Sequence, residues 1–281
     1  MKYIDTHCHM NFAVYESDIQ DVIARTKKHS VAVINIGTQK DTSAKAVALA
    51  EKNDHLWAIV GLHPIHTQTS FHDHDEVGEE GEEFTSRGEI FNSQYYRQLI
   101  QSSDKVVGIG ECGLDYYRNT PKTKEVQEKA FREQIELALE CNLPLMLHVR
   151  PSQGSYDAYE DVLEILEEYK KDNQQLRGQA HFFAGSAEIA QRFINLGFYV
   201  SFTGVVTFTK DYDNTIKSIP LDMILSETDA PYVTPAPYRG QRNEPIHVRE
   251  VVKRLAELHN VTEDEMCSEI QKNVHKLYGI Q

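Results

Sequence analysis

The chain has 281 residues, of which 40% are hydrophobic and 26% charged, a balance typical of globular proteins with a buried core. No run of about 18 apolar residues occurs, so the sequence predicts no membrane span. The formal net charge of −14 repels polyanions such as DNA at long range, so an anionic substrate would need cations or clustered arginines at the site.

Short apolar runs alternate with helical patterns along almost the whole chain. We expect strands at Tyr3–Asp5, Val31–Ile36, Trp57–Leu62, Val106–Gly110, Leu145–Val149, Gln179–Phe183, Phe198–Phe202 and Met223–Ser226. We expect helices at Ser17–His29, Thr42–Asn53, Gln94–Ser103, Lys124–Cys141, Tyr156–Lys170, Ala187–Leu196, Tyr212–Ser218, His247–Leu258 and Glu263–Leu277. Eight strand-then-helix units in this length predict an α/β protein, a single (β/α)₈ TIM-type barrel over residues 1–281.

One segment, Ile65–Asn92, interrupts this alternation after the third predicted strand. It is rich in Asp, Glu and Gly and also contains His66, His72 and His74. Like charges and glycine predict a solvated, mobile insertion loop within the barrel. A metal-binding histidine cluster is the less favoured alternative, because nothing predicts rigid ligand geometry there.

The first predicted strand leads into Asp5-Thr6-His7-Cys8-His9. Side chains two residues apart share a face of a strand, so Asp5, His7 and His9 are expected to point together and Cys8 away from them. Two imidazoles at the end of a strand can chelate one metal ion. The motif is short, and taken alone it fits two ordinary polar side chains equally well.

The other strand ends also carry histidines and carboxylates, namely His63, Glu111, His148, His181 and Asp229. In a TIM barrel, catalytic groups gather at the C-terminal face, each from a different strand. So many buried polar groups would be costly unless they shared protons or cations. We therefore favour a metal centre over structural polar residues.

The number of these groups exceeds what one ion needs, so two ions are plausible, with a carboxylate between them. Glu111 is the candidate bridge, and Asp229 could bind an ion, accept a proton from water, or do both. Arginines in the loops above the same face could bind phosphate oxygens, and with His63 they are the predicted substrate contacts: Arg118, Arg150, Arg239 and Arg242.

Seven segments together resemble the TatD family of metal-dependent nucleases, within the amidohydrolase-like superfamily. They are Asp5–His9 (DTHCH), Gly61–Pro64 (GLHP), Gly110–Arg118 (GECGLDYYR), Pro144–Arg150 (PLMLHVR), His181–Ser186 (HFFAGS), Ser226–Tyr232 (SETDAPY) and Arg239–Pro245 (RGQRNEP). The segments follow the family's order and span nearly the whole chain.

The resemblance implies one metal ion held by His7, His9, Glu111 and Asp229, and a second held by Glu111, His148 and His181. It also implies two divalent ions, Mg²⁺ by the family's description, acting in a DNase with 3′ to 5′ exonuclease action. Histidine-rich ligation itself favours Zn²⁺, Mn²⁺ or Ni²⁺ over Mg²⁺, which prefers oxygen.

Three functions follow as hypotheses. The first is phosphodiester hydrolysis at single-stranded DNA ends, with Asp229 and Glu111 as catalytic residues. The second is ester or amide hydrolysis by the same activated water, for example of a D-aminoacyl-tRNA. The third, a non-catalytic scaffold, is disfavoured because all six ligand positions are intact.

The remaining expectations concern the setting of the protein. The N-terminal segment lacks the basic and apolar regions of a signal peptide, so we expect a cytoplasmic protein with no membrane partner. The four cysteines show no paired spacing, which predicts reduced thiols and no disulfide framework. We also expect a monomer.

Overall fold

The computed structural model describes residues 1–69, 71–72, 84–85, 87–117 and 121–280. Eight strands pair in parallel in the order β1 (Tyr3–Cys8), β2 (Val31–Ile36), β3 (Leu56–Val60), β6 (Val106–Asp115), β7 (Leu145–Arg150), β8 (Gly178–Ala180), β9 (Phe198–Phe202) and β10 (Ile224–Ser226). Within this sheet, each strand lies beside the next of the eight in chain order, as successive βα units require.

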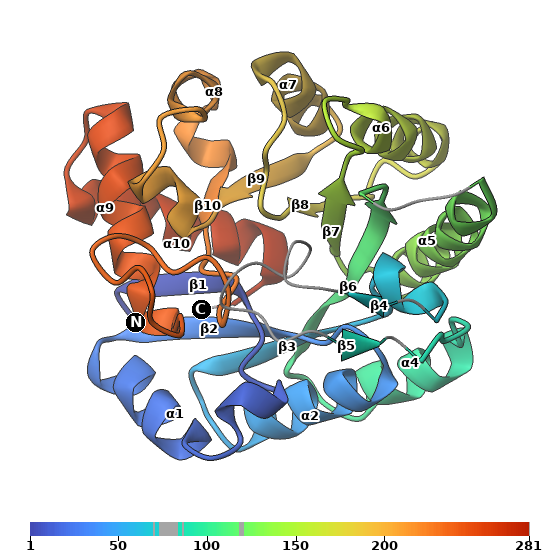
Figure 1. The fold of residues 1–281 in the computed structure, drawn as a ribbon, viewed down its shortest axis with the longest axis horizontal. Helices are drawn as coiled ribbons and strands as arrows, with labels where there is room; N and C mark the ends of the chain where they lie inside the picture. The colour runs from blue at the N-terminus through green and yellow to red at the C-terminus, as the bar shows by residue number, and fades with distance from the viewer. Residues whose placement is uncertain (70, 73–83, 86, 118–120, 281) are drawn as a thin grey trace.

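The first and last strands meet and bring the sheet round on itself (Figure 1). Cys8 forms a parallel bridge with Ala230, just beyond the end of β10. The His9 amide donates to the Ala230 carbonyl at 2.7 Å, and the Asp229 amide donates to the His7 carbonyl at 2.9 Å. The predicted TIM barrel is confirmed, and its closure lies directly beside the first histidines.

Helices surround the sheet as predicted, with ends shifted by a few residues (Figure 1). They are α1 (Ile19–Lys28), α2 (Lys40–Glu51), α4 (Ser93–Gln101), α5 (Pro121–Cys141), α6 (Asp157–Lys170), α7 (Ala187–Asn195), α8 (Asp213–Ser218), α9 (Val248–His259) and α10 (Glu263–Tyr278). Short 3-10 helices are η1 (Ala13–Tyr15), η2 (Pro64–Thr67), η3 (Gly204–Thr207), η4 (Leu221–Met223) and η5 (Pro245–His247). Within the described ranges, none of the helices is both long and apolar enough to cross a membrane.

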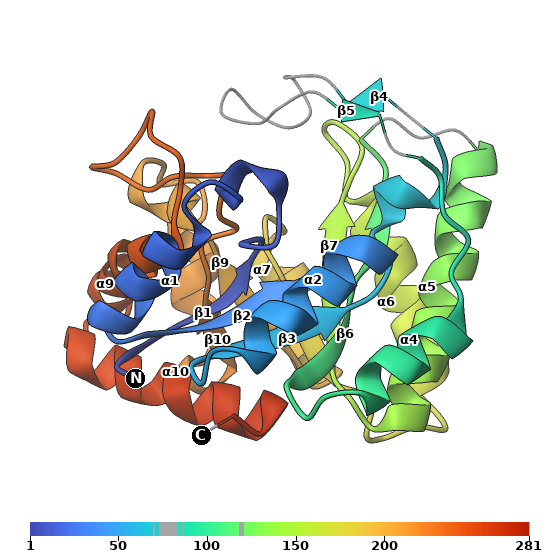
Figure 2. The same ribbon diagram turned by 90° about the horizontal axis from the view of Figure 1, so that it is seen from below.

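Helix α10 crosses the end of the barrel opposite the loops that follow the strands (Figure 2). Its sequence marks both ends. Thr262 and Glu265 form a capping box, in which each side chain accepts a hydrogen bond from the backbone amide of the other residue. Gly279 ends the helix with a φ of 71°, a conformation that favours glycine. Tyr278, the last helical residue, is buried against the barrel.

Two strands run further than predicted, which changes where their polar residues lie. β1 continues to Cys8 and β6 to Asp115, and the pairing register shifts between Asp5 and Cys8 and between Ile109 and Cys112. Glu111 therefore lies within β6, and the prediction that it ends the strand is wrong. A register shift re-aims side chains, because the simple alternation of faces is broken there.

The middle of the predicted insertion loop, residues 73–83, lies outside the described residues, as do residues 70 and 86. Its described flanks differ from the expectation of a plain loop, because β4 (Phe71–His72) and β5 (Phe84–Thr85) pair antiparallel. Figure 2 shows this two-stranded sheet above the C-terminal ends of the barrel strands.

Candidate metal centre

The structure brings all six predicted ligands together at the C-terminal end of the barrel. His7 lies in β1 and His9 follows it; Glu111 lies in β6, His148 in β7, His181 just after β8 and Asp229 after β10. His148 is partly exposed and the other five are buried. The convergence follows from topology, since the C-terminal ends of parallel barrel strands share one face.

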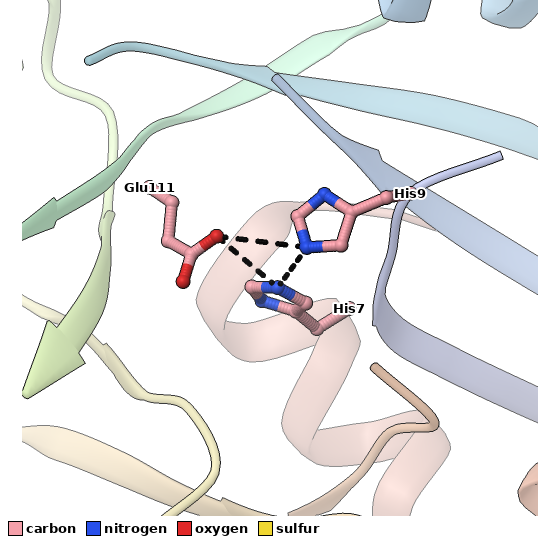
Figure 3. Close-up of side chains that lie close together, drawn as sticks. All are labelled: His7, His9 and Glu111. Atoms are coloured by element: carbon pink, nitrogen blue, oxygen red, sulfur yellow. Dashed lines mark hydrogen bonds and ion pairs between the residues drawn. The ribbon is translucent and has the colours of Figure 1, made fainter. Parts of the chain in front are cut away.

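The first group of atoms surrounds the two histidines of β1. Nε2 of His7 lies 3.2 Å from Nε2 of His9 (Figure 3). Glu111 Oε2 lies 3.5 and 3.7 Å from these two nitrogens. Asp229 Oδ1 lies 3.5 and 3.4 Å from the same pair. Two ring nitrogens at this distance repel each other through their lone pairs unless a proton or a cation lies between them.

The spacing of these atoms fits a metal ion. Ligands about 2.1 Å from a tetrahedral ion lie about 3.4 Å from one another. The separations of 3.2 to 3.7 Å among His7, His9, Glu111 and Asp229 bracket that value. Two imidazoles and two carboxylates are also donors that transition metals bind well. The residues present therefore fit a divalent cation.

A second group of atoms gathers around the other oxygen of Glu111. Oε1 lies 2.9 Å from His148 Nδ1 and 3.1 Å from His181 Nε2. It also lies 3.4 Å from His63 Nε2. The two oxygens of this one carboxylate thus face two different sets of histidines, the geometry a bridging carboxylate requires.

His63 belongs to the second group by distance, but its tautomer argues against ligation. The Ile65 amide donates to His63 Nδ1 at 3.1 Å, so in the neutral ring the proton sits on Nε2. A nitrogen that carries a proton has no lone pair for a metal. Burial, followed by the charge of His148, lowers the pKa of His63 to about 4, so the ring is a neutral donor. The role predicted for it, a substrate contact, stays a prediction.

Hydrogen bonds behind the histidines orient the rings. His148 Nε2 lies 2.8 Å from Asp115 Oδ2, and His181 Nδ1 lies 3.2 Å from Glu227 Oε1. His9 Nδ1 lies 3.1 Å from the Ile36 carbonyl. These acceptors take the proton of one ring nitrogen and leave the lone pair of the other for the centre, as in known histidine metal sites.

The carboxylates are held in their charged form. Burial alone would raise the pKa of Glu111, but His63, His7 and His181 around it hold that pKa well below its usual range. Burial would also raise the pKa of Asp229, but the hydrogen bond to His9 and the charge of His181 lower it. Both groups are therefore charged at neutral pH and suited to hold cations.

The histidines divide into two kinds. Burial would lower the pKa of His181, but the charges of Glu227 and Glu111 raise it well above its usual range. Burial would also lower the pKa of His148, but hydrogen bonds to Asp115 and Glu111 raise it. By contrast, burial and the charge of His181 lower the pKa of His7, whose ring stacks on that of His181 at 3.6 Å. His148 and His181 must therefore lose protons before they bind a metal ion.

Asp5 does not point at the centre with His7 and His9, so that prediction is wrong. Its carboxylate accepts hydrogen bonds from the Thr228 amide at 2.9 Å and the Thr228 hydroxyl at 2.6 Å. Cys8 agrees with its prediction, because its thiol contacts the Ile34 carbonyl and takes no part in either group.

The predicted arginine contacts differ in their surroundings. Arg118 lies outside the described residues. Arg150 stacks on Tyr117 at 3.9 Å, and Arg239 stacks on Phe208 at 4.4 Å.

Arg242 has a different environment. Its guanidinium forms two hydrogen bonds to the Asp18 carboxylate, at 2.9 and 2.6 Å, and one to the Val14 carbonyl at 2.8 Å. Arg242 therefore holds its loop against η1 and the start of α1. Because its guanidinium is already bonded there, a direct contact with substrate, as predicted, is disfavoured.

Two carboxylates that contact ligand histidines, Asp115 and Glu227, were not predicted from the sequence. A signal for each was present, because each lies at an interval of two or four from a predicted ligand: Asp115 from Glu111, and Glu227 from Asp229. What the interval does not reveal is the partner, since Glu227 bonds His181, which is 46 positions away.

Comparison with known proteins gives a consistent result. The family model described as TatD related DNase matches residues 4–279. An uncharacterized metal-dependent hydrolase of Bacillus subtilis, YabD, is 37% identical over 279 residues, covering 98% of both chains. The Escherichia coli K12 protein YcfH, described in the same words, is 32% identical, covering 100% of this chain and 97% of its own. The crystal structure of YjjV, a TatD homologue from E. coli K12, superposes with a TM-score of 0.81 at 28% identity, covering 100% of this chain and 99% of the other.

Proposed function

Because this chain belongs to the family of TatD-related DNases and is a metal-dependent hydrolase, we propose that it hydrolyses phosphodiester bonds at single-stranded 3′ ends of DNA. The observation that supports this most is the position of Glu111. Its two oxygens face separate sets of histidines. Two cations that share a carboxylate suit phosphoryl chemistry, in which both the attacking and the leaving oxygen gain charge.

The six predicted ligands would hold these cations in two sets. One set is His7, His9, Glu111 and Asp229, and the other is Glu111, His148 and His181. Divalent ions bound here would lower the pKa of the attacking water and neutralise charge on the phosphate. The mixed nitrogen and oxygen donors favour Mn²⁺, Zn²⁺ or Ni²⁺ over Mg²⁺.

Two residues supply proton chemistry of their own. The lowered pKa of Asp229 keeps its carboxylate charged, so it can accept the proton of the attacking water. His63 presents its Nε2 proton toward the centre. It faces Glu111 Oε1, whereas His7 and His9 face Oε2. It can donate that hydrogen bond to a phosphate oxygen, where negative charge develops during cleavage.

The loops above the centre supply features that suit a nucleotide. Arg150 over Tyr117 and Arg239 over Phe208 each pair a cation with an aromatic ring. Proteins that bind single strands combine positive charge with rings on which bases stack. The face that these residues occupy is the one where the strands end, so a strand bound there would bring its phosphates to the centre.

The test is cleavage of DNA by metal-free protein to which defined ions are returned. Single-stranded DNA labelled at its 5′ end should shorten stepwise with Mn²⁺ and stay intact with chelator. His148→Ala should abolish the shortening. His29→Ala, a change at the end of α1 away from the centre, should not alter it. Equal rates in the wild type and in His148→Ala would refute the proposal.

An ester or amide hydrolase, such as a deacylase of D-aminoacyl-tRNA, is the second candidate. The net charge of −14 favours a small or neutral ester over DNA or tRNA, because such a substrate is repelled less than a polyanion. The same metal-loaded protein should be offered carboxylic esters and DNA side by side. Cleavage of the ester alone, lost in His148→Ala, would favour this function.

A further inference from the structure

A buried network of polar side chains lies beneath the second set of histidines. Glu227 is fully buried, and both of its oxygens are engaged. Oε1 accepts from the Phe182 amide at 2.6 Å and faces His181 Nδ1 at 3.2 Å. Oε2 accepts from the Ser201 hydroxyl at 2.7 Å and from Gln179 Nε2 at 3.0 Å.

This arrangement determines which nitrogen of His181 carries the proton. A carboxylate oxygen can only accept, so His181 Nδ1 must donate to Glu227. Once the ring is neutral, the lone pair of Nε2 faces Glu111 Oε1, 3.1 Å away, and the two atoms could bind the second ion together. Any change that moves Glu227 would therefore change the ligand itself.

The network continues to the other end of the barrel. Gln179 lies on β8, two residues before His181, and its Oε1 accepts from the Tyr278 hydroxyl at 2.7 Å. Its Nε2 is surrounded by acceptors: the Thr6 hydroxyl at 2.8 Å, the Ser201 hydroxyl at 2.7 Å and Glu227. With its oxygen toward Tyr278, the Gln179 amide donates to these groups and accepts from the Tyr278 hydroxyl at the same time, so Tyr278 and Glu227 together set its orientation.

Tyr278 comes from the last turn of α10, which crosses the barrel end remote from the metal centre (Figure 2). A hydroxyl buried there needs a partner, because an unpaired buried polar group is costly. An apolar ring would fill the same space without that requirement. Here the hydroxyl ends a chain of hydrogen bonds that runs from Tyr278 through Gln179 and Glu227 to a metal ligand.

We propose that Tyr278 is a positioning residue for the metal centre, acting through Gln179 and Glu227 on His181. The hydroxyl holds the Gln179 amide in one orientation, the amide holds Glu227, and Glu227 fixes the proton of His181 on Nδ1. Occupancy of the second metal position then depends on this hydrogen bond at the foot of the barrel. The inference rests on the metal centre but not on DNA as the substrate.

The test uses the full-length protein stripped of metal and titrated with Mn²⁺ alone, so it needs no substrate. Tyr278→Phe keeps the ring and removes only the hydroxyl. Changes behind a histidine ligand typically weaken metal binding about 10- to 100-fold. We expect Glu227→Gln to weaken the second binding step within that range. Tyr278 lies two residues beyond Glu227 in the chain of hydrogen bonds. Tyr278→Phe should therefore weaken binding of the second Mn²⁺ ion less, at least about threefold, and leave binding of the first ion unchanged.

The matched control is Asn273→Ala, also on α10. The Asn273 amide donates to the Leu221 and Ile224 carbonyls, at 2.8 and 2.9 Å, and it has no link to His181. Thermal unfolding measures how far each variant loosens the helix. If Asn273→Ala weakens the second step as much as Tyr278→Phe does, the effect comes from helix docking and the proposal is overturned.

Nitrogen NMR of the metal-free protein gives a second measurement, the chemical shifts of the His181 ring nitrogens. These shifts would not change if Tyr278 only held the helix in place. The ring nitrogens of His181 are assigned by their loss in His181→Asn. At a pH high enough to make the ring neutral, the wild type should show Nδ1 protonated and hydrogen-bonded and Nε2 unprotonated. In Tyr278→Phe the shifts of these two nitrogens should move toward each other as the proton distribution changes. Unchanged shifts together with unchanged Mn²⁺ affinity would overturn the proposal.

Discussion

The hydrogen bond between Asp115 and His148 yields the sharpest prediction. Replacing one oxygen of Asp115 by an NH₂ group changes which ring nitrogen of His148 carries the proton. Asp115 Oδ1 accepts from the Tyr117 amide at 3.1 Å, and Oδ2 lies 2.8 Å from His148 Nε2. In Asp115→Asn the amide oxygen must stay with the Tyr117 amide. The new NH₂ group then faces His148 Nε2, which must give up its proton and accept.

The consequence falls on the other ring nitrogen. With Nε2 as an acceptor, the proton of His148 moves to Nδ1, the atom that lies 2.9 Å from Glu111. A hydrogen bond to a charged group contributes about 1.5–3 kcal/mol, and about 1.4 kcal/mol corresponds to tenfold in affinity. We therefore expect Asp115→Asn to weaken binding of the second ion about 10- to 100-fold.

The assay is calorimetric titration of metal-free protein with Mn²⁺. Asp161→Asn is the control, because Asp161 accepts from the Tyr116 hydroxyl at 2.8 Å and is not bonded to His148. The control should bind both ions like the wild type. If Asp115→Asn also binds both ions with unchanged affinity, the argument from the tautomer is refuted.

Three further predictions follow from the site. His63→Ala should keep both metal ions but lower kcat about 100-fold, the usual scale for one lost donor; loss of an ion from this variant would show that His63 is a ligand. Because the pKa values of His148 and His181 are raised above the usual 6.5, protons compete with metal at these rings; affinity should fall as pH falls, and should still be rising above pH 6.5. A pH-independent affinity between pH 6 and 8 would contradict this. Arg239→Ala should raise KM for DNA with little effect on thermal unfolding, whereas Arg242→Ala should lower the unfolding temperature; the reverse pattern would reassign the two arginines.

The arrangement of the barrel and most of its ligands could be predicted from the sequence because both follow local rules. Strand periodicity placed His7, His148 and His181 near strand ends, and parallel topology brings such ends to one face. These rules use only the spacing of residues along the chain, so they survive errors of a few positions in each boundary.

The parts that could not be predicted depend on contacts between distant residues. Asp5 bonds Thr228, 223 positions away, instead of joining the ligands, and the pairing of β6 with β7 continues past Glu111 to Asp115. The role of Arg242 depends on Asp18, a partner 224 positions away. Spacing along the chain carries no information on such pairs.

We propose that two ions share Glu111 and that both are needed to cleave DNA. The most direct measurement adds Mn²⁺ stepwise to metal-free protein and follows the shortening of single-stranded DNA at each ratio of metal to protein. We expect the rate to level off at two equivalents in the wild type and to stay at background in Glu111→Gln. Full activity at one equivalent, or full activity in Glu111→Gln, would contradict the claim.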